Sequence, residues 1–60
     1  MSLKLKRIEK NIKQKDLAKM LGISQATLVK IEKSNYENLR FGLMKKISEI
    51  LETPFTELFL

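Results

Sequence analysis

The sequence predicts an all-α fold of five short helices, and three observations support that prediction. Apolar residues recur at spacings of three and four along most of the chain, which is the period of amphipathic helices. No stretch alternates between apolar and polar residues with the period of a strand. Residues that typically end or begin helices separate the periodic segments. With 60 residues, the chain is expected to form a single domain over residues 1–60.

The first helix is expected over Leu3–Asn11. Leu5, Ile8 and Ile12 recur at helical spacing and are predicted to face the core, with charged residues such as Arg7 on the other faces. A basic amphipathic helix is also typical of segments that lie on membranes. This segment is short and lacks an aromatic anchor, which favours the core interpretation.

The second helix is expected over Gln14–Leu21. Its inner stripe is predicted to consist of Leu17, Ala18 and Leu21, with Met20 at the margin of the apolar face.

A glycine and a serine separate this helix from the next one. Gly22 stands where a helix end usually requires a left-handed backbone, which glycine adopts at the least cost. Ser24 is a candidate N-cap, because its hydroxyl can accept a hydrogen bond from a backbone N–H in the next turn. The third helix is expected over residues 25–33, with Leu28 and Ile31 facing inward.

The last third of the chain predicts a loop and two further helices. Residues 34–38 show no periodicity and are expected to form the loop. The fourth helix is expected over Arg40–Leu51. Its side chains predicted to face the core are Phe41, Met44, Ile47 and Leu51. A short last helix is expected over Pro54–Phe59, with Thr53 as its cap.

Composition restricts the functions that are possible. The chain contains no cysteine and no histidine, which removes disulfides, thiolate metal sites and the usual general base near neutral pH. The remaining carboxylates and lysines are not clustered in the sequence. We therefore expect no enzymatic activity, no cofactor and no metal.

The net charge of +5 is distributed unevenly. Residues 1–46 contain all 12 Lys and Arg and only four acids, a balance of +8, whereas residues 47–60 carry −3. A basic surface attracts phosphates at long range, although lysines that merely solubilise a small domain give the same composition. No apolar run approaches the roughly 18 residues of a membrane span. The N-terminus lacks the apolar core of a signal peptide, which predicts a cytoplasmic protein.

The link between the second and third helices is the most informative feature. Gly22, Ile23 and Ser24 form a connection that is too short for two parallel neighbours. Helices joined by such a turn cross at roughly 90–120°, which is the helix-turn-helix arrangement. In that arrangement Ala18 is small where the two helix backbones approach each other.

Several residues in this region match a known pattern, namely Gln14, Leu17-Ala18, Leu21-Gly22-Ile23-Ser24, Thr27-Leu28 and Ile31-Glu32. The chain resembles the phage repressor and Cro family of helix-turn-helix DNA-binding domains, often called the XRE family. Its later helices are also similar to the family's fourth and fifth helices, through Phe41–Leu51 and the ending Leu51-x-x-Pro54-Phe55-x-x-Leu58. The resemblance implies a five-helix repressor-like domain that binds operator DNA as a dimer and regulates transcription.

The resemblance also implies which residues contact bases in the major groove of double-stranded DNA. These are Gln25, Ala26, Val29 and Lys30. Glutamine can pair with adenine through two hydrogen bonds, and the methyl group of alanine can contact a thymine methyl. Lys30 is expected to reach guanine or a phosphate, or to stay in solvent. Val29 is apolar and predicted to face outward, which either a thymine contact or partial burial at the helix edge would explain.

Contacts to DNA phosphates are implied for a second set: Gln14, Arg7, Ser24, Thr27, Lys33, Asn35, Tyr36, Asn38 and Arg40. Arg7 and Glu32 match a family pair that joins the first helix to the third. We expect this pair to be exposed, to contribute about 0–1 kcal/mol, and to hold the arginine near the DNA backbone. The family often has a glycine after the Glu32 position and an Asn-Pro pair before the fourth helix. This chain has Lys33-Ser34 and Asn38-Leu39 there, which puts the phosphate contacts of the loop in doubt.

The sequence therefore predicts a sequence-specific DNA-binding regulator, most simply a repressor. The alternative is a protein-interaction module, or an antitoxin-like protein that binds a partner through the same fold. A homodimer through the C-terminal helices is also expected, because this end holds more apolar residues than one small core would bury. The residues that motivate this expectation are Ile50, Phe55, Phe59 and Leu60.

Overall fold

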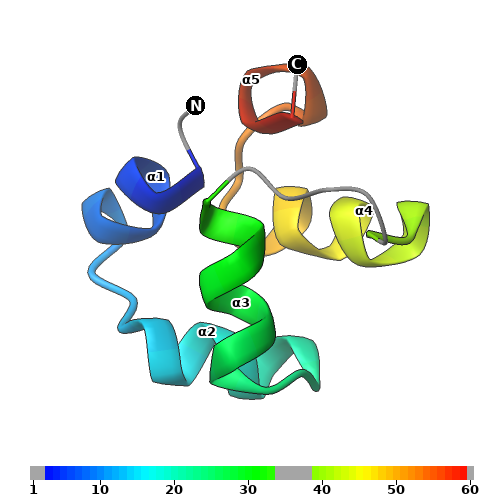
Figure 1. Ribbon diagram of the computed structural model, residues 1–60. Helices are drawn as coiled ribbons and strands as arrows, with labels where there is room; N and C mark the ends of the chain where they lie inside the picture. The colour runs from blue at the N-terminus through cyan, green and yellow to red at the C-terminus, as the bar shows by residue number, and fades with distance from the viewer. Residues whose placement is uncertain (1–2, 34–38, 60) are drawn as a thin grey trace.

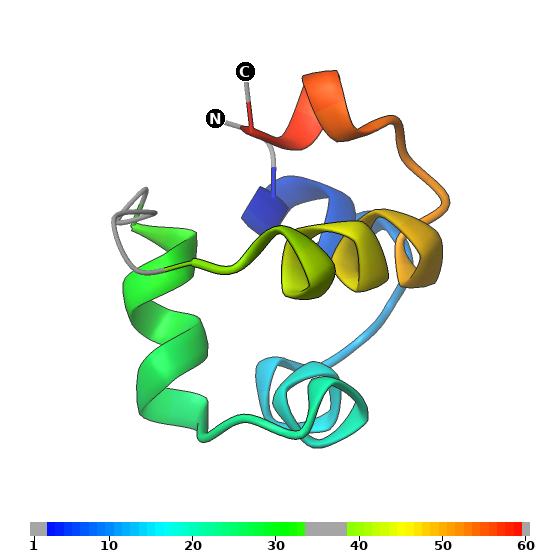
Figure 2. The same ribbon diagram turned by 90° about the vertical axis from the view of Figure 1, so that its right-hand side faces the viewer.

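The computed structural model describes residues 3–33 and 39–59, which form five helices (Figure 1). In chain order these are α1 (Leu3–Glu9), α2 (Gln14–Leu21), α3 (Gln25–Glu32), α4 (Phe41–Ile50) and α5 (Phe55–Phe59). The described ranges contain no strand, which confirms the all-α prediction. Figure 2 shows α2 and α5 at opposite ends of the molecule, with α4 between them.

The junction between α2 and α3 is formed as predicted. Gly22 has a left-handed backbone with φ of 72°, and its N–H donates to the carbonyl of Lys19 at 3.1 Å. A residue with a Cβ adopts this conformation only with strain, so glycine ends α2 at least cost. Ser24 then caps α3, because its Oγ accepts a hydrogen bond from the N–H of Thr27 at 3.1 Å. α3 ends at Glu32, one residue earlier than expected.

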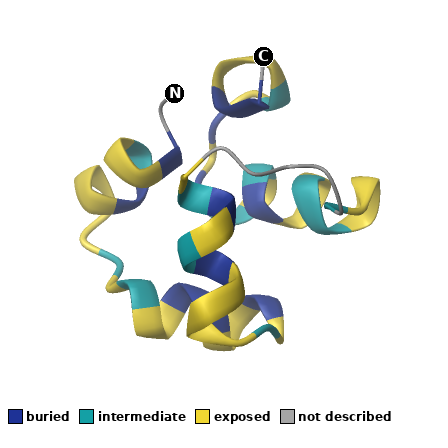
Figure 3. Ribbon diagram, viewed as in Figure 1, coloured by how far each residue is buried: buried dark blue, intermediate teal, exposed yellow. Residues whose placement is uncertain are grey.

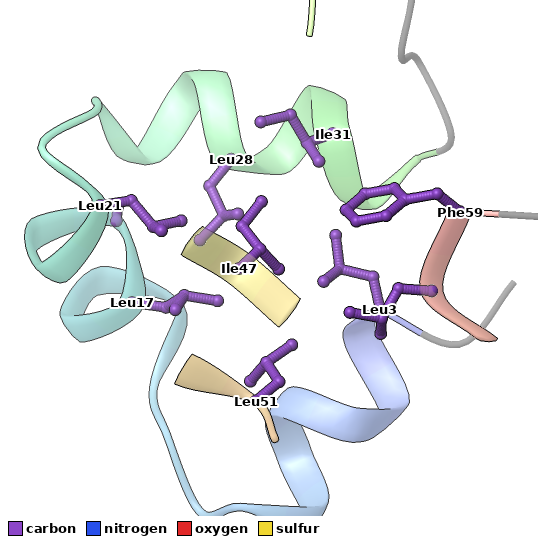
Figure 4. Packing of buried hydrophobic residues seen from close by; sticks show 10 residues of the cluster. Leu3, Leu17, Leu21, Leu28, Ile31, Ile47, Leu51 and Phe59 are labelled. Atoms are coloured by element: carbon purple, nitrogen blue, oxygen red, sulfur yellow. The ribbon is translucent and has the colours of Figure 1, made fainter. Parts of the chain in front are cut away.

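The core lies where α2, α3 and α4 meet, with one buried apolar residue from α1 and two from α5 (Figure 4). Among the described residues, the buried apolar side chains are Leu3, Leu17, Ala18, Leu21, Leu28, Ile31, Ile47, Leu51, Leu58 and Phe59. The inward residues predicted for the second and third helices are all in this set. Figure 4 shows Leu3 and Phe59 close together, so the two ends of the domain close the core jointly.

The prediction of which face of α1 is buried was wrong. Leu5 and Ile8, which were expected in the core, are 62% and 51% exposed. The helix instead buries Leu3 and Arg7, which lie four residues apart on one face. The physical reason is the ion pair of Arg7 with Glu32, which determines the side of α1 that faces the domain.

α1 also ends earlier than expected. The helix stops at Glu9, and Asn11 has a left-handed φ of 58°, a conformation that asparagine tolerates better than most residues. The chain then turns back, and the N–H of Ile12 donates to the carbonyl of Arg7 at 3.1 Å. Ile12 packs partly buried against the core, so this third residue of the predicted stripe does face inward.

Of the four residues of the expected fourth helix that were predicted to face the core, all but Phe41 do so. Ile47 and Leu51 are buried and Met44 is partly buried, but Phe41 is 69% exposed. Phe41 is the first residue of the helix and lies beyond the core, where its ring contacts Phe55 of α5 at a centroid distance of 5.8 Å. α4 is one residue shorter at each end than expected.

α5 begins at Phe55, one residue later than predicted. The Thr53 hydroxyl, expected to cap this helix, donates to the carbonyl of Leu51 at 2.8 Å in the turn before it. Phe59 is buried, so it completes the core of a single chain, whereas Ile50 and Phe55 are only partly buried. The fourth residue invoked for dimerisation, Leu60, lies outside the described residues.

Candidate nucleic-acid interface

The first turn of α3 is exposed to solvent (Figure 3). Gln25 and Ala26 follow the cap directly and are both exposed, and Lys30 is exposed one turn later. Val29 is partly buried, which accounts for an apolar residue at this position without requiring a ligand. Residues four apart share one face of a helix, so Gln25 lies with Val29 and Ala26 with Lys30. The four predicted base-contacting residues therefore form one continuous edge of α3.

Gln25 is held in place by the preceding helix. Its Nε2 donates to Oε1 of Gln14 at 3.1 Å, which ties the start of α3 to the start of α2. A side-chain amide carries two N–H groups and one carbonyl oxygen. The bond to Gln14 uses one N–H of Gln25. One N–H and the carbonyl oxygen are left for a ligand.

Gln14 is in turn anchored to the far end of α3. Its Nε2 donates to Oε1 of Glu32 at 3.0 Å, while Oε2 of Glu32 accepts from Nε of Arg7 at 2.6 Å. Arg7 also donates through Nη2 to Oε1 of Glu32 at 3.4 Å and through Nη1 to the carbonyl of Ile12 at 2.9 Å. A connected set of hydrogen bonds thus joins α1, α2 and both ends of α3.

The expectation that the Arg7–Glu32 pair is exposed was wrong. The side chains are only 10% and 4% exposed, so the pair belongs to the interior of the domain. An ion pair at this depth is retained only when hydrogen bonds satisfy its remaining polar atoms, and here the Gln14 amide and the Ile12 carbonyl do so. Because its side chain is largely buried and each of its three nitrogens already donates a hydrogen bond within the domain, Arg7 is a poorer candidate for a phosphate contact than the sequence suggested.

The other predicted phosphate-contacting residues fall into three places. Ser24 and Thr27 are exposed at the start of α3, and their hydroxyl oxygens are 2.8 Å apart. Lys33 is exposed at the opposite end of the same helix, and Arg40 is exposed where α4 begins. Three further candidates, Asn35, Tyr36 and Asn38, lie outside the described residues, as does Ser34 of the departure from the family pattern.

The pairing of Arg7 with Glu32 that the resemblance implied is confirmed, but the hydrogen bond from Gln14, which places Glu32 at the centre of this network, was not predicted. The carboxylate receives hydrogen bonds from both Arg7 and Gln14, although these residues are 25 and 18 positions away in the chain. One weak signal was available, because Arg7 stands four residues after Leu3, the spacing of a shared helix face. Apolar periodicity alone does not count an arginine as an inward residue.

Other kinds of site find no support in the part of the chain that is described. No group of three or more His, Cys, Asp or Glu residues could hold a metal ion there. None of the described helices has the length and apolar character needed to span a membrane. A shallow polar groove of about 300 Å³ is lined by α1 and the turn after α4, and its Lys10 and Glu52 form an exposed ion pair at 3.0 Å.

Comparison with known families identifies the fold and its function class. The family model described as helix-turn-helix matches residues 3–58, which covers all five helices except the last residue of α5. Searches of curated proteins and of solved structures returned no match. The family consists of DNA-binding regulatory domains rather than enzymes. The chain belongs to the XRE-type helix-turn-helix family of DNA-binding transcriptional regulators.

Proposed function

We propose that this protein is a cytoplasmic, sequence-specific repressor that places α3 in the major groove of double-stranded DNA. The observation that carries the proposal is the geometry of Gln25. Its side chain is exposed at the capped start of α3 and is held there by Gln14. The N–H and the carbonyl oxygen left on this amide are the pair of groups that the major-groove edge of adenine requires.

The remaining base contacts follow from the same edge of α3. The methyl group of Ala26 is exposed beside Gln25 and suits a thymine methyl. The exposed part of the Val29 side chain can contact the methyl group of a second thymine. The exposed side chain of Lys30 is long enough to contact guanine or a phosphate. Gln14 fixes both ends of α3, because it bonds to Gln25 at the start of the helix and to Glu32 at its end. DNA binding would therefore not incur the entropic cost of ordering this helix.

Contacts to the DNA backbone would hold α3 in this orientation. We assign them to Gln14, Ser24 and Thr27 at one end of α3, and to Lys33 and Arg40 at the other. Asn35, Tyr36 and Asn38 remain further candidates by resemblance. Such contacts fix register on the duplex but carry no direct sequence information.

Selection of bound sites from a random DNA pool tests the base contacts. The wild-type protein should select a defined site that contains an adenine at the position contacted by Gln25. The variant Gln25→Ala should lose about 1–3 kcal/mol of binding free energy and relax the preference at that one base pair. An unchanged sequence preference in the variant would contradict the assignment of Gln25.

Lys33→Ala provides the matched control for a backbone contact. Its binding should weaken by a similar factor for every sequence, and the slope of log K against log salt should fall by about one unit. A change in sequence preference without a change in slope would move Lys33 from the phosphate set to the base set. If the wild-type protein shows no salt-dependent DNA binding, the proposed function itself is wrong.

We also propose that the protein binds its operator as a homodimer through α4 and α5. Support comes from the exposed ring of Phe41, which continues into Phe55 and Phe59 at centroid distances of 5.8 and 5.3 Å. A symmetric dimer requires a palindromic operator with half-sites about one helical turn apart. Sedimentation at high concentration should show dimers that Phe41→Ser weakens. A monomer with and without operator DNA would contradict this proposal.

A further inference from the structure

α1 carries an apolar stripe that the domain does not use. Leu5 and Ile8 lie three residues apart on the same side of the helix and are mostly exposed. Among the described residues, the only other large apolar side chains with comparable exposure are Met20 and Phe41, on two different helices. Figure 3 shows the outer side of α1 as exposed. Two neighbouring aliphatic side chains on one seven-residue helix therefore form a patch rather than a scattered pair.

A groove continues this patch toward α2. It has a volume of about 330 Å³ and is lined by Ile8 and Ile12, together with Arg7, Asn11 and Lys13. Asn11 shapes the groove, because its left-handed backbone ends α1 and turns the chain back along it. A groove of this size beside two exposed aliphatic residues can take the side chains of one turn of an apolar helix face.

The charges around the stripe have one predominant sign. No acidic residue lines the groove, whereas Lys13 does. Lys4 is exposed on α1 and forms no ion pair with another described residue. The nearest acid on the helix, Glu9, is paired with Lys6 at 3.5 Å. An apolar strip with cations along it complements a helix that carries apolar residues on one face and carboxylates beside them.

We propose that the stripe Leu5–Ile8 and the adjoining groove, with Lys4 and Lys13 at their edges, form a docking site for an acidic amphipathic helix of a partner protein. The site is separate from the edge of α3 that begins at Gln25, although Lys13 immediately precedes Gln14 at the border of that interface. A docked partner would therefore lie next to the DNA without covering the base-contacting residues. The proposal does not depend on which DNA sequence is bound.

Titration of the isotope-labelled protein with designed peptides tests the proposal. The probe is a helical peptide with leucine at alternating spacings of three and four and glutamate elsewhere. Amide chemical-shift changes are expected along α1 and at Lys13, and a matched peptide with lysine in place of glutamate should leave these signals unchanged. The double variant Leu5→Gln and Ile8→Gln should weaken binding about tenfold or more, because it removes the apolar anchors. Glutamine is a good helix former, so α1 should be retained.

Met20→Gln is the control variant, because Met20 is 48% exposed but lies on α2 outside the stripe. It should bind the acidic peptide as the wild-type protein does. Three results would overturn the proposal: shifts confined to the exposed residues of α3, equal binding by the double variant, or α1 shifts that appear with protein concentration alone. The last result would identify a second copy of the chain as the occupant. DNA binding measured on the double variant should be unchanged, which separates this proposal from the proposed function.

Discussion

α1 and α3 are helices of seven and eight residues that contact each other, yet they attach to the domain in different ways. α3 buries two aliphatic side chains, Leu28 and Ile31. α1 buries one aliphatic side chain, Leu3, and one cation, Arg7. Attachment through a charged residue turns the more apolar side of α1 toward solvent. An ion partner in the interior can therefore orient a short helix against its own hydrophobic pattern.

Magnitudes explain why the ion pair determines the orientation. Turning α1 so that Leu5 and Ile8 face the core would bury two aliphatic side chains and expose one, Leu3. The net stabilisation from burial would be that of one aliphatic side chain, or roughly 1.5–3 kcal/mol. The same rotation would leave the carboxylate of Glu32 buried without its cation. Breaking a buried pair in this way costs about 3–5 kcal/mol. The second effect is the larger one, so α1 faces the domain through Arg7.

The largest expected effect comes from removing the carboxylate that orients α1. Glu32→Ala leaves the guanidinium of Arg7 in the interior without its partner, and should lower the free energy of unfolding by about 3–5 kcal/mol. The control is Glu52→Ala, which breaks the exposed pair with Lys10 and should cost at most about 1 kcal/mol. Urea unfolding followed by circular dichroism measures both values. Equal losses in the two variants would show that the buried pair does not orient α1.

Truncating one leucine in α3 and one in α1 compares how much each helix contributes to stability through its apolar residues. Leu28→Ala removes a fully buried side chain of α3 and should lower the free energy of unfolding by about 2–5 kcal/mol. Leu5→Ala removes a mostly exposed side chain of α1 and should change it by less than about 0.5 kcal/mol. The same denaturation experiment applies. A large loss in Leu5→Ala would mean that α1 packs through the face that its periodicity suggests.

The smallest effect concerns the turn that makes α2 and α3 a unit. Gly22→Ala should lower the free energy of unfolding by about 1–2 kcal/mol, because alanine is strained at a φ of 72°. Gly42→Ala, in the helical backbone of α4, should instead raise it by about 0.5–1 kcal/mol. An added Cβ meets nothing within 4 Å at either position, so backbone conformation alone separates the two variants. Thermal unfolding would measure the difference, and the same sign for both would contradict it.

Much of the candidate DNA interface was predictable because its determinants are local. Gly22 and Ser24 act within one turn of their own positions, so the end of α2 and the start of α3 follow from residue type. The exposure of Gln25 and Ala26 then follows from the burial of Leu28. The hydrogen bond between Gln14 and Gln25 is a contact between two helices, which apolar periodicity does not predict.

Three features could be predicted from the residues alone: the all-α class, the helix-turn-helix junction and the inward residues of α2 and α3. These features depend on short-range backbone preferences and on apolar faces that meet other apolar faces. Three others emerge only in the folded domain: which side of α1 is buried, that the Arg7–Glu32 pair is internal, and that Phe41 stays outside the core. The physical reason is distance along the chain. Arg7 and Glu32 are separated by 25 residues, and no local pattern records the strength of an interaction between partners that only folding brings together.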